Sequence, residues 1–379
     1  MEWKIPLSDI DLGVEDQAAV DKVLSSKWLT MGSVTQEFEQ AFAAHVGVKY
    51  ALAVTNATAA LHLACIIAGL KPGDEAIVPS LTFVATANAV RYTGAVPVFA
   101  DITSENDLNI SYKSIEGAIT KRTRAILVMH YGGYPCDMPS IMGLAREHNL
   151  IVIEDAAHAV GSELEGRKMG TWGDMGCFSF FSNKNMTTGE GGMLVTDNEA
   201  YSQRAHLLRS HGMTTLTWDR HKGHAWSYDV VDLGYNYRID EIRAALGMVQ
   251  LGKLESNNER RRQLTKIYRE VLEEFAPQLV VPFANHSGIS AAHLMPMLLP
   301  TGTDKLNFMN NMKAQGIQTS VHYPAVHAFT AYADGKAKYC LPLTEELAAR
   351  EVTLPLYPAL SDEQVVTVGR AVAQALEPS

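Results

Sequence analysis

The sequence predicts an α/β protein with a mostly parallel central sheet, and three observations lead to that prediction. Between about residues 50 and 198, short apolar runs alternate with segments whose apolar residues recur at helical spacing. The runs, such as "EAIVPS" and "LIVIED", are almost unbroken, as strands are when helices cover both faces of a parallel sheet. Beyond Asp240 the pattern changes to a long helical stretch, short strands and a closing helix. We therefore expect a large α/β domain at residues 1–250, with an N-terminal arm at 1–35, and a smaller α+β domain at 251–379.

The elements can be assigned in order along the chain. After a strand at 50–56, the apolar Leu61, Cys65 and Ala68 recur at helical spacing, and a glycine and the "KPGD" turn end this helix. A glycine-rich turn that follows Lys184 separates the last two strands of the large domain. The other expected strands lie at 75–80, 95–102, 123–133, 150–158, 174–181, 191–198 and 293–300, and the expected helices at 57–70, 82–94, 138–149, 239–275 and 361–377.

Composition limits the classes of partner. The chain carries 42 acidic and 32 basic residues, a formal net charge of −10. Nucleic acid and anionic membranes repel a negative protein, so we expect neither as a partner. The cysteines at 65, 136, 177 and 340 are far apart and form no C-x-x-C pair, which predicts reduced thiols. The N-terminus lacks the apolar region of a signal peptide, and no apolar stretch reaches spanning length, so we expect a soluble cytoplasmic protein.

Polar residues gather where the expected strands end, and ligands of open parallel sheets bind at such ends. Here the ends carry Asn56, His130, Asp155 and Lys184. Lys184 closes an apolar run and precedes "TTGEGG", a turn whose glycines let the backbone approach a ligand closely. A partly desolvated lysine amine has a lowered pKa and becomes a nucleophile toward carbonyl groups. Lys184 is therefore a candidate nucleophile, although most lysines are merely solvated.

Two further features add to this candidate. Asp155 at the end of a buried strand is costly unless it is paired, and a protonated pyridine nitrogen would be a suitable partner. A helix cap or a structural ion pair would explain it equally well. Asn56 and Thr58 lie where a strand leads into a helix, where free N–H groups bind phosphate, unless the two residues only cap the helix. Asp155 and His158 could suggest metal ligands, but no third ligand accompanies them, so we expect no metal.

A nicotinamide dehydrogenase would be the obvious alternative for an alternating α/β chain. Such a site needs G-x-G-x-x-G between a strand and a helix, and here "GEGG" lies between two strands. A nucleophilic lysine, an acid for a pyridine nitrogen and a phosphate-binding helix start are together the fittings for pyridoxal 5'-phosphate (PLP). The combination therefore favours a PLP enzyme.

The segment "EDAAHAVGSELEGRKMGTWGDMGCFSFFSNKNMTTGEGGMLVTD" also resembles a known family, the DegT/DnrJ/EryC1/StrS aminotransferases that aminate nucleotide-linked keto sugars. The likeness continues in "WLTMGSVTQEFEQAFA", "IVPSLTFVATANA", "YDVVDLGYNYRIDEIRAALG" and "VHYPAVH", and so spans nearly the whole chain. It implies a fold-type-I PLP-dependent transferase with a seven-stranded sheet. It also implies a homodimer with a composite active site.

The resemblance assigns roles to single residues. It implies that Lys184 is the Schiff-base lysine and the acid and base of a later proton shift, and that Asp155 keeps the pyridine nitrogen protonated. Phe83 matches an aromatic residue that stacks on the ring, and His158 a position beside the ring and its phenolic oxygen. The expected phosphate contacts are Ala57, Thr58, Ser179 and, from the other subunit, Asn236; the candidate substrate contacts are Thr30, Arg238 and His322.

Departures from the family pattern bear on the substrate. Ala57 stands where many relatives have glycine, and "FFSNKN" replaces the commoner "FYPTKN". Lys184 is retained where a dehydratase branch carries histidine. The turn "KNMTTGEGG" resembles enzymes that aminate C4 of a sugar, whereas the C3 branch tends to carry "KNLGALGDGG". The resemblance thus implies ping-pong transfer from L-glutamate to a nucleotide-linked 4-keto sugar. A keto-inositol (aminocyclitol), a C3-keto sugar, and a catalytically silent PLP-binding scaffold or regulator stay as alternatives.

Overall fold

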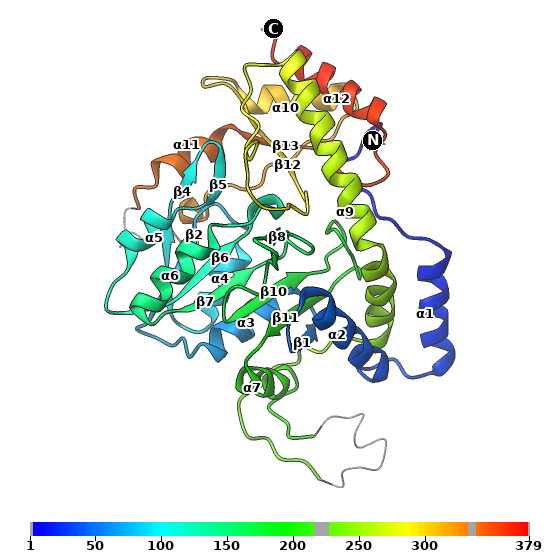
Figure 1. Cartoon of the computed structure of the whole chain (residues 1–379), viewed down its shortest axis with the longest axis vertical. Helices are drawn as coiled ribbons and strands as arrows, with labels where there is room; N and C mark the ends of the chain where they lie inside the picture. Colours follow the sequence, from blue (N-terminus) through cyan, green and yellow to red (C-terminus); the bar gives the residue numbers. More distant parts are fainter. Residues whose placement is uncertain (1–2, 216–226, 333–338, 378–379) are drawn as a thin grey trace.

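A seven-stranded sheet in the order β1-β11-β10-β7-β6-β2-β3 forms the centre of the large domain (Figure 1). The computed structural model describes residues 3–215, 227–332 and 339–377. Within the sheet, β11 runs antiparallel to both of its neighbours, and the other pairings are parallel. The predicted mostly parallel sheet is therefore confirmed. Its strands are β1 (Tyr50–Val54), β2 (Glu75–Pro79), β3 (Val96–Ala100), β6 (Thr123–Met129), β7 (Ile151–Asp155), β10 (Met175–Ser179) and β11 (Gly192–Thr196).

Helices cover both faces of this sheet, which explains the unbroken apolar strands. Alternate strand residues point to opposite faces, so Ile77 joins one hydrophobic core and its neighbours Ala76 and Val78 the other. The first core is shared with α2 (Ser33–Val46), α5 (Tyr112–Ala118), α6 (Met138–His148) and the start of α9 (Glu241–Phe275). The second is shared with α3 (Ala57–Ile67), α4 (Ala85–Tyr92) and α7 (Glu199–Arg209).

A smaller unit packs at one end of the large domain (Figure 1). Its core joins the C-terminal half of α9 to the two-stranded sheet of β12 and β13 and includes Ile5 from the N-terminal arm. The predicted boundary at residue 250 falls inside α9, whose Leu254 belongs to the large core and Leu264 to the small one. The elements here are β12 (Met295–Leu298), α10 (Lys305–Ala314), β13 (Glu351–Leu354) and α12 (Asp362–Ala375).

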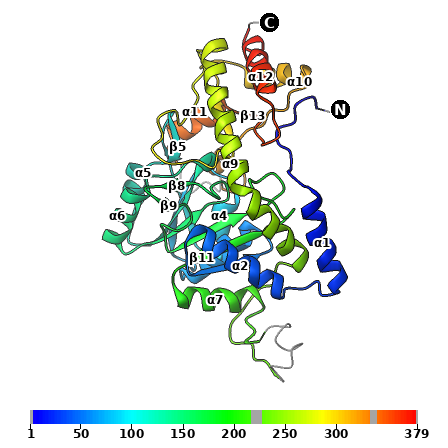
Figure 2. The same ribbon diagram turned by 45° about the vertical axis from the view of Figure 1, so that its right-hand side comes forward.

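The remaining elements lie around these three cores. Figure 2 shows α1 (Val14–Ser26) alongside α9, where the ammonium of Lys253 contacts the carboxylate of Asp16 at 2.6 Å. In the parts of the chain that the structure describes, no helix has the length and apolar character needed to cross a membrane. The other short elements are β4 (Ile102–Ser104), β5 (Asp107–Ile110), η1 (Tyr131–Gly133), β8 (Glu163–Leu164), β9 (Arg167–Lys168), η2 (Val326–Ala328) and α11 (Pro342–Arg350).

A buried carboxylate joins the starts of α9 and α2. Glu241 accepts hydrogen bonds from the backbone N–H groups of Gly32, Val34 and Thr35 at 2.8–2.9 Å, and from the Thr35 hydroxyl at 2.6 Å. These N–H groups lack partners within α2, and a negative charge is favourable at a helix N-terminus. Glu241 therefore fixes α2 against the helix that both cores share.

We predict that Glu241→Ala destabilises the protein by about 2–4 kcal/mol, because four donors in a buried setting lose their acceptor. The measurement is the midpoint of urea unfolding. The matched control is Glu37→Ala, an exposed acid on the same helix α2, which should cost no more than about 0.5 kcal/mol. Equal midpoints for the two variants would contradict this account of Glu241.

Candidate active site

A cavity of about 430 Å³ lies at the carboxyl ends of the parallel strands. It begins beside Asn56, just after β1, and extends past the last residues of β6, β7 and β10 to His322 and Tyr323, in the loop between α10 and η2. The structure thus brings most of the sequence-predicted residues to one place. Those that line the cavity are Ala57, Thr58, Phe83, Asp155, His158, Ser179, Lys184 and His322.

Three predicted residues do not line this cavity in the single chain. Thr30 forms an isolated bridge with Asp240, the residue that caps the start of α9, and Asn236 forms one with Ser210, the residue after α7. Arg238 bridges to Val54 at the end of β1. The backbone of Arg238 is therefore close to the start of the cavity, although its side chain is not part of the lining.

Lys184 lies in the turn beyond β10 rather than at the end of the strand. The strand ends at Ser179, the Phe180 N–H still donates to Gly191 O, and the Lys184 N–H then donates to Phe181 O at 2.9 Å. This turn directs the amine into the cavity. Burial lowers the pKa of Lys184 to about 8, and the nearby Asp155 carboxylate opposes that shift. The site thus contains an amine that is far less basic than an ordinary lysine.

Asp155 is the last residue of β7 and is 3% exposed. Its Oδ2 accepts a hydrogen bond from the Thr86 hydroxyl at 2.7 Å, and its Oδ1 one from the Ala157 N–H at 3.2 Å. Burial raises the pKa of Asp155, whereas these hydrogen bonds and the charge of Lys184 lower it. A cation held against this carboxylate would compensate the cost of burying it.

The start of α3 forms another wall. Asn56 Oδ1 caps the helix by accepting from the Ala59 N–H at 2.8 Å, while helix geometry leaves the N–H groups of Ala57 and Thr58 without carbonyl partners inside the helix. Gly192 on β11 packs against this turn. A Cβ on Gly192 would lie 2.5 Å from the Asn56 carbonyl carbon and 2.6 Å from the Ala57 nitrogen. Asn56 therefore caps the helix and still leaves donors for an anion.

Orphaned polar atoms show that the cavity suits a polar, aromatic ligand. His158 Nδ1 and Asn183 Oδ1 are buried without a hydrogen-bond partner, although His158 Nε2 and the Tyr323 hydroxyl are 2.9 Å apart. Buried polar atoms normally find partners. Phe83 and Phe181 are 55% and 44% exposed at the same cavity, and so present ring surface to it. The lysine, acid, helix start and aromatic faces therefore fit PLP.

His322 is held from behind by β13. Its N–H donates to Glu351 Oε2 at 2.7 Å, and its Nδ1 lies 2.8 Å from Thr353 Oγ1, which itself donates to Glu351 Oε1. Because the Thr353 hydroxyl donates its hydrogen to Glu351, its oxygen can only accept from His322. The ring hydrogen of His322 therefore lies on Nδ1. Burial lowers the pKa of His322 to about 4. A neutral imidazole with its free nitrogen at Nε2 thus borders the cavity.

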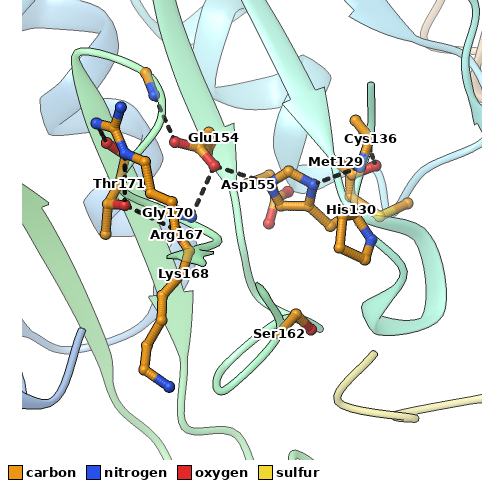
Figure 3. Close-up of polar contacts among 12 residues, drawn as sticks. Met129, His130, Cys136, Glu154, Asp155, Ser162, Arg167, Lys168, Gly170 and Thr171 are labelled. Carbon is orange, nitrogen blue, oxygen red and sulfur yellow. Dashed lines mark hydrogen bonds and ion pairs between the residues drawn. The ribbon is translucent and has the colours of Figure 1, made fainter. Parts of the chain in front are cut away.

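The expectation that His130 joins the cavity is wrong. Figure 3 shows His130 paired with Glu154, whose Oε2 accepts from His130 Nε2 at 2.9 Å and from the Gly170 N–H at 2.7 Å. His130 Nδ1 accepts the Cys136 N–H, which fixes the proton on Nε2. Successive strand residues point to opposite faces, so Glu154 lies behind the sheet when Asp155 faces the cavity. This buried pair supports β7 from behind.

Other sequence expectations concern metals and thiols. In the described ranges, no group of three or more His, Cys, Asp or Glu residues is placed to hold a metal ion. The four cysteines are free; burial raises the pKa of three of them, Cys65, Cys136 and Cys177. These thiols are packing groups and not nucleophiles.

Several side chains at or beside the site were not predicted from the sequence. Thr86 was hidden in the expected helix at 82–94, one turn beyond Thr82, to which it also hydrogen-bonds. Tyr323 and Asn183 adjoin residues that the sequence singled out, and adjacency was the available clue. His293 lies 3.4 Å from the Lys184 amine although 109 residues separate them. No periodicity or motif predicts such a contact.

A family model described as the DegT/DnrJ/EryC1/StrS aminotransferase family matches residues 11–373. The chain is 40% identical to the spore coat polysaccharide biosynthesis protein SpsC of Bacillus subtilis, over 98% of this chain and 96% of SpsC. It is similar in structure to Spr1654 of Streptococcus pneumoniae in its PMP-form, with a TM-score of 0.91 and 27% identity. The match covers 98% of this chain and 99% of Spr1654. It is also similar to DesI in the presence of its TDP-sugar product, with a TM-score of 0.88 and 32% identity. That match covers 99% of this chain and 93% of DesI.

The chain belongs to the DegT/DnrJ/EryC1/StrS aminotransferase family, because the match covers nearly its whole length. Spr1654 has been solved in a PLP-form as well. The protein is accordingly a PLP-dependent aminotransferase with the fold-type-I architecture. The resemblance drawn from the lysine segment and the expected cofactor are both confirmed.

We predict that Gly192→Ala destabilises the protein by about 1–3 kcal/mol and weakens PLP binding at least about tenfold, because the added Cβ displaces the backbone at Asn56 and Ala57. Urea unfolding and a PLP titration measure the two effects. Gly252→Ala is the control. Gly252 is an exposed residue in the middle of α9, and a Cβ added there meets no atom within 4 Å. It should stabilise by up to about 1 kcal/mol and leave PLP affinity unchanged.

Proposed function

We propose that the protein transfers the amino group of L-glutamate to C4 of a nucleotide-linked 4-keto sugar. The observation that carries the proposal is one cavity lined by a buried amine of lowered pKa, a buried carboxylate and a helix N-terminus. Glutamate becomes 2-oxoglutarate in a first half-reaction, and the keto sugar becomes an amino sugar in a second. No net redox partner is needed, because one carbonyl group is formed and another is consumed.

We further propose which residues of the cavity hold the cofactor. Bound PLP supplies an electron sink for carbon–hydrogen bond cleavage. Its phosphate would be held by Ala57, Thr58 and Ser179, and its ring by Phe83, with His158 beside the phenolic oxygen. Asp155 would hold the protonated pyridine nitrogen, the cation that its buried carboxylate lacks. Lys184 would be the lysine to which the cofactor attaches.

The acidity of Lys184 suits a group that must both give and take a proton. At pH 7 an amine with a pKa of about 8 is neutral in about one molecule in ten, against about one in a few thousand for an ordinary lysine. The same pKa leaves the protonated form abundant. Lys184 can therefore act as the nucleophile, and later as the base and acid at a substrate carbon.

Three observations support a nucleotide-linked sugar as acceptor. The turn "KNMTTGEGG" at 184–192 is similar to that of C4-aminating family members. DesI, one of the similar structures, was solved with a TDP-sugar product, and SpsC takes part in polysaccharide biosynthesis. Phe83 and Phe181 present exposed rings at the cavity, where a base or sugar face could stack. His322, with a free ring nitrogen, is a proposed substrate contact.

A homodimer with a composite site forms part of the proposal. The segment before Asn236 and Arg238 exposes large apolar side chains, among them Val230 and Val231 at 55% and Leu233 at 81%. Such an apolar stretch favours burial against a second copy. The dimer would allow Asn236 to reach the partner's phosphate and would place Thr30 and Arg238 as substrate contacts.

We expect Lys184→Ala to reduce turnover at least about 10⁴-fold while the protein stays folded, because no other described amine lines the cavity. Absorbance of the PLP-loaded protein before and after L-glutamate measures the first half-reaction separately. Glutamate should shift the spectrum of the native protein and leave that of the variant unchanged. If glutamate and other amino acids leave the spectrum of the native protein unchanged, the result would instead support a catalytically silent PLP-binding scaffold.

The acceptor should be identified with the glutamate-treated enzyme. Nucleotide-linked 4-keto sugars are expected to return the original spectrum and yield a C4 amine by NMR of the product. The nucleotide-linked 3-keto sugars and keto-inositols form the matched comparison set. A faster response to either of these would overturn the C4 assignment while retaining the aminotransferase.

A further inference from the structure

His293 contacts the amine of Lys184 from behind the cavity: it lines a small neighbouring cavity together with Asn183 and His322. Its Nε2 lies 3.4 Å from Lys184 Nζ, and the residue is 5% exposed. The backbone around it is anchored, since the His293 N–H donates to Gly132 O at 2.9 Å, two residues before β12 begins at Met295. The imidazole is therefore held at a fixed place beside Lys184.

The hydrogen bonds behind the ring determine which nitrogen carries the proton. Asn258 on α9 donates its Nδ2 to Val160 O, so its Oδ1 accepts from Asn185 Nδ2 at 2.7 Å. Asn185 Nδ2 gives its second hydrogen to Ala291 O at 2.7 Å. Asn185 Oδ1 is thus an acceptor, and it faces His293 Nδ1 at 2.8 Å. The ring hydrogen consequently lies on Nδ1, and Nε2 presents a lone pair to Lys184.

The surroundings keep this imidazole neutral. Burial lowers the pKa of His293 well below its usual value, and the neighbouring Lys184, His158, Arg261 and His322 act in the same direction. The proton therefore remains on the lysine, which is the stronger base of the two.

We propose that His293 is a positioning residue, whose Nε2 accepts an N–H of Lys184 and so fixes the direction of the amine. The inference rests on the proposed role of Lys184. No bond to His293 forms or breaks. When one N–H of the amine points at Nε2, the lone pair of the neutral amine, or the transferable proton of the ammonium, must occupy one of the other tetrahedral directions of Nζ. These include the open cavity, where the cofactor and the substrate carbon would lie.

A second consequence concerns the acidity of the amine. An ammonium N–H makes a stronger hydrogen bond than a neutral amine does, so an acceptor at Nε2 stabilises the protonated lysine. The other titratable groups at this cavity are Asp155 after β7, Glu190 in the turn after Lys184, and His158, His322 and Tyr323. Asp155 stabilises the ammonium as well, and His158 and His322 are kept neutral by burial. Removing the His293 acceptor should therefore lower the lysine pKa further.

The test compares His293→Leu with His293→Gln. Glutamine can donate its amide to Asn185 and still present an oxygen to Lys184, whereas leucine does neither. The cofactor is removed, PLP is added back, and the rate at which the lysine-bound absorbance develops is followed from pH 6 to 10. This rate follows the neutral fraction of Lys184 and needs no turnover. The matched control is His286→Gln, which changes a histidine bonded to Pro135 O in a different cavity.

We expect the midpoint of this pH profile to fall by roughly one unit in His293→Leu, a tenfold change in the proton affinity of Lys184. The His293→Gln and His286→Gln profiles should stay within a few tenths of the native profile. Native-like behaviour of the leucine variant would overturn the inference and leave the aminotransferase proposal intact. Absence of any Lys184-dependent absorbance in the native protein would instead refute the proposed role of Lys184.

A measurement on the native protein keeps the inference testable if the leucine variant does not fold. In protein labelled with ¹⁵N-histidine, the resonances that disappear in His293→Gln identify the ring. At pH 7 we expect a neutral imidazole with hydrogen on Nδ1 and an Nε2 shift typical of a hydrogen-bond acceptor. Hydrogen on Nε2, or a doubly protonated ring, would exclude the proposed contact.

Discussion

Burial of Lys184 and Asp155 against one cavity is the constraint on which the site depends. Burial favours the neutral form of each group, so it lowers the pKa of the amine to about 8 and raises that of the carboxyl, while their mutual attraction opposes both shifts. Neither effect dominates completely, which leaves a reactive amine and an acid that still benefits from a cationic partner. In the proposed arrangement PLP would meet both demands, with its aldehyde at the amine and its pyridine nitrogen at the carboxylate.

The sheet fixes Asp155 through the register of β7. Asp155 faces the cavity because Glu154 faces the other way, toward His130 and the N–H groups of Gly170 and Gly173. A shift of β7 by one residue would bury Glu154 against the cavity and leave three donors behind the sheet without their acceptor. The polar contacts behind β7 thus disfavour the wrong register, in addition to the apolar residues. The position of Asp155 is, in this sense, determined from the opposite face of the sheet.

Local pattern predicted the strands of the sheet and, at the cavity, Asn56, Thr58, Asp155 and Lys184. The family resemblance was needed for Phe83, Ser179 and His322. The unbroken strands, the glycines after Lys184 and the strand-to-helix junction at Asn56 are features of short segments, and each carries its own signal. His130 was misplaced because proximity to a strand end does not say which face a side chain takes. His293 and its partners Asn185 and Asn258 come from three distant segments, and their contacts depend on tertiary packing that no single segment encodes.

The same contacts bear on the division into two domains. Asn258 lies on α9, the helix that contributes to both cores, and His293 immediately precedes the small sheet. Both residues hydrogen-bond to Asn185, which follows Lys184 in the chain. The small domain therefore supplies the acceptor for an amine that the large domain positions. If that acceptor sets part of the lysine's proton affinity, then a displacement of β12 changes the chemistry at Lys184 without any change in the large domain. The reactivity of the amine would then depend on how the two domains pack together.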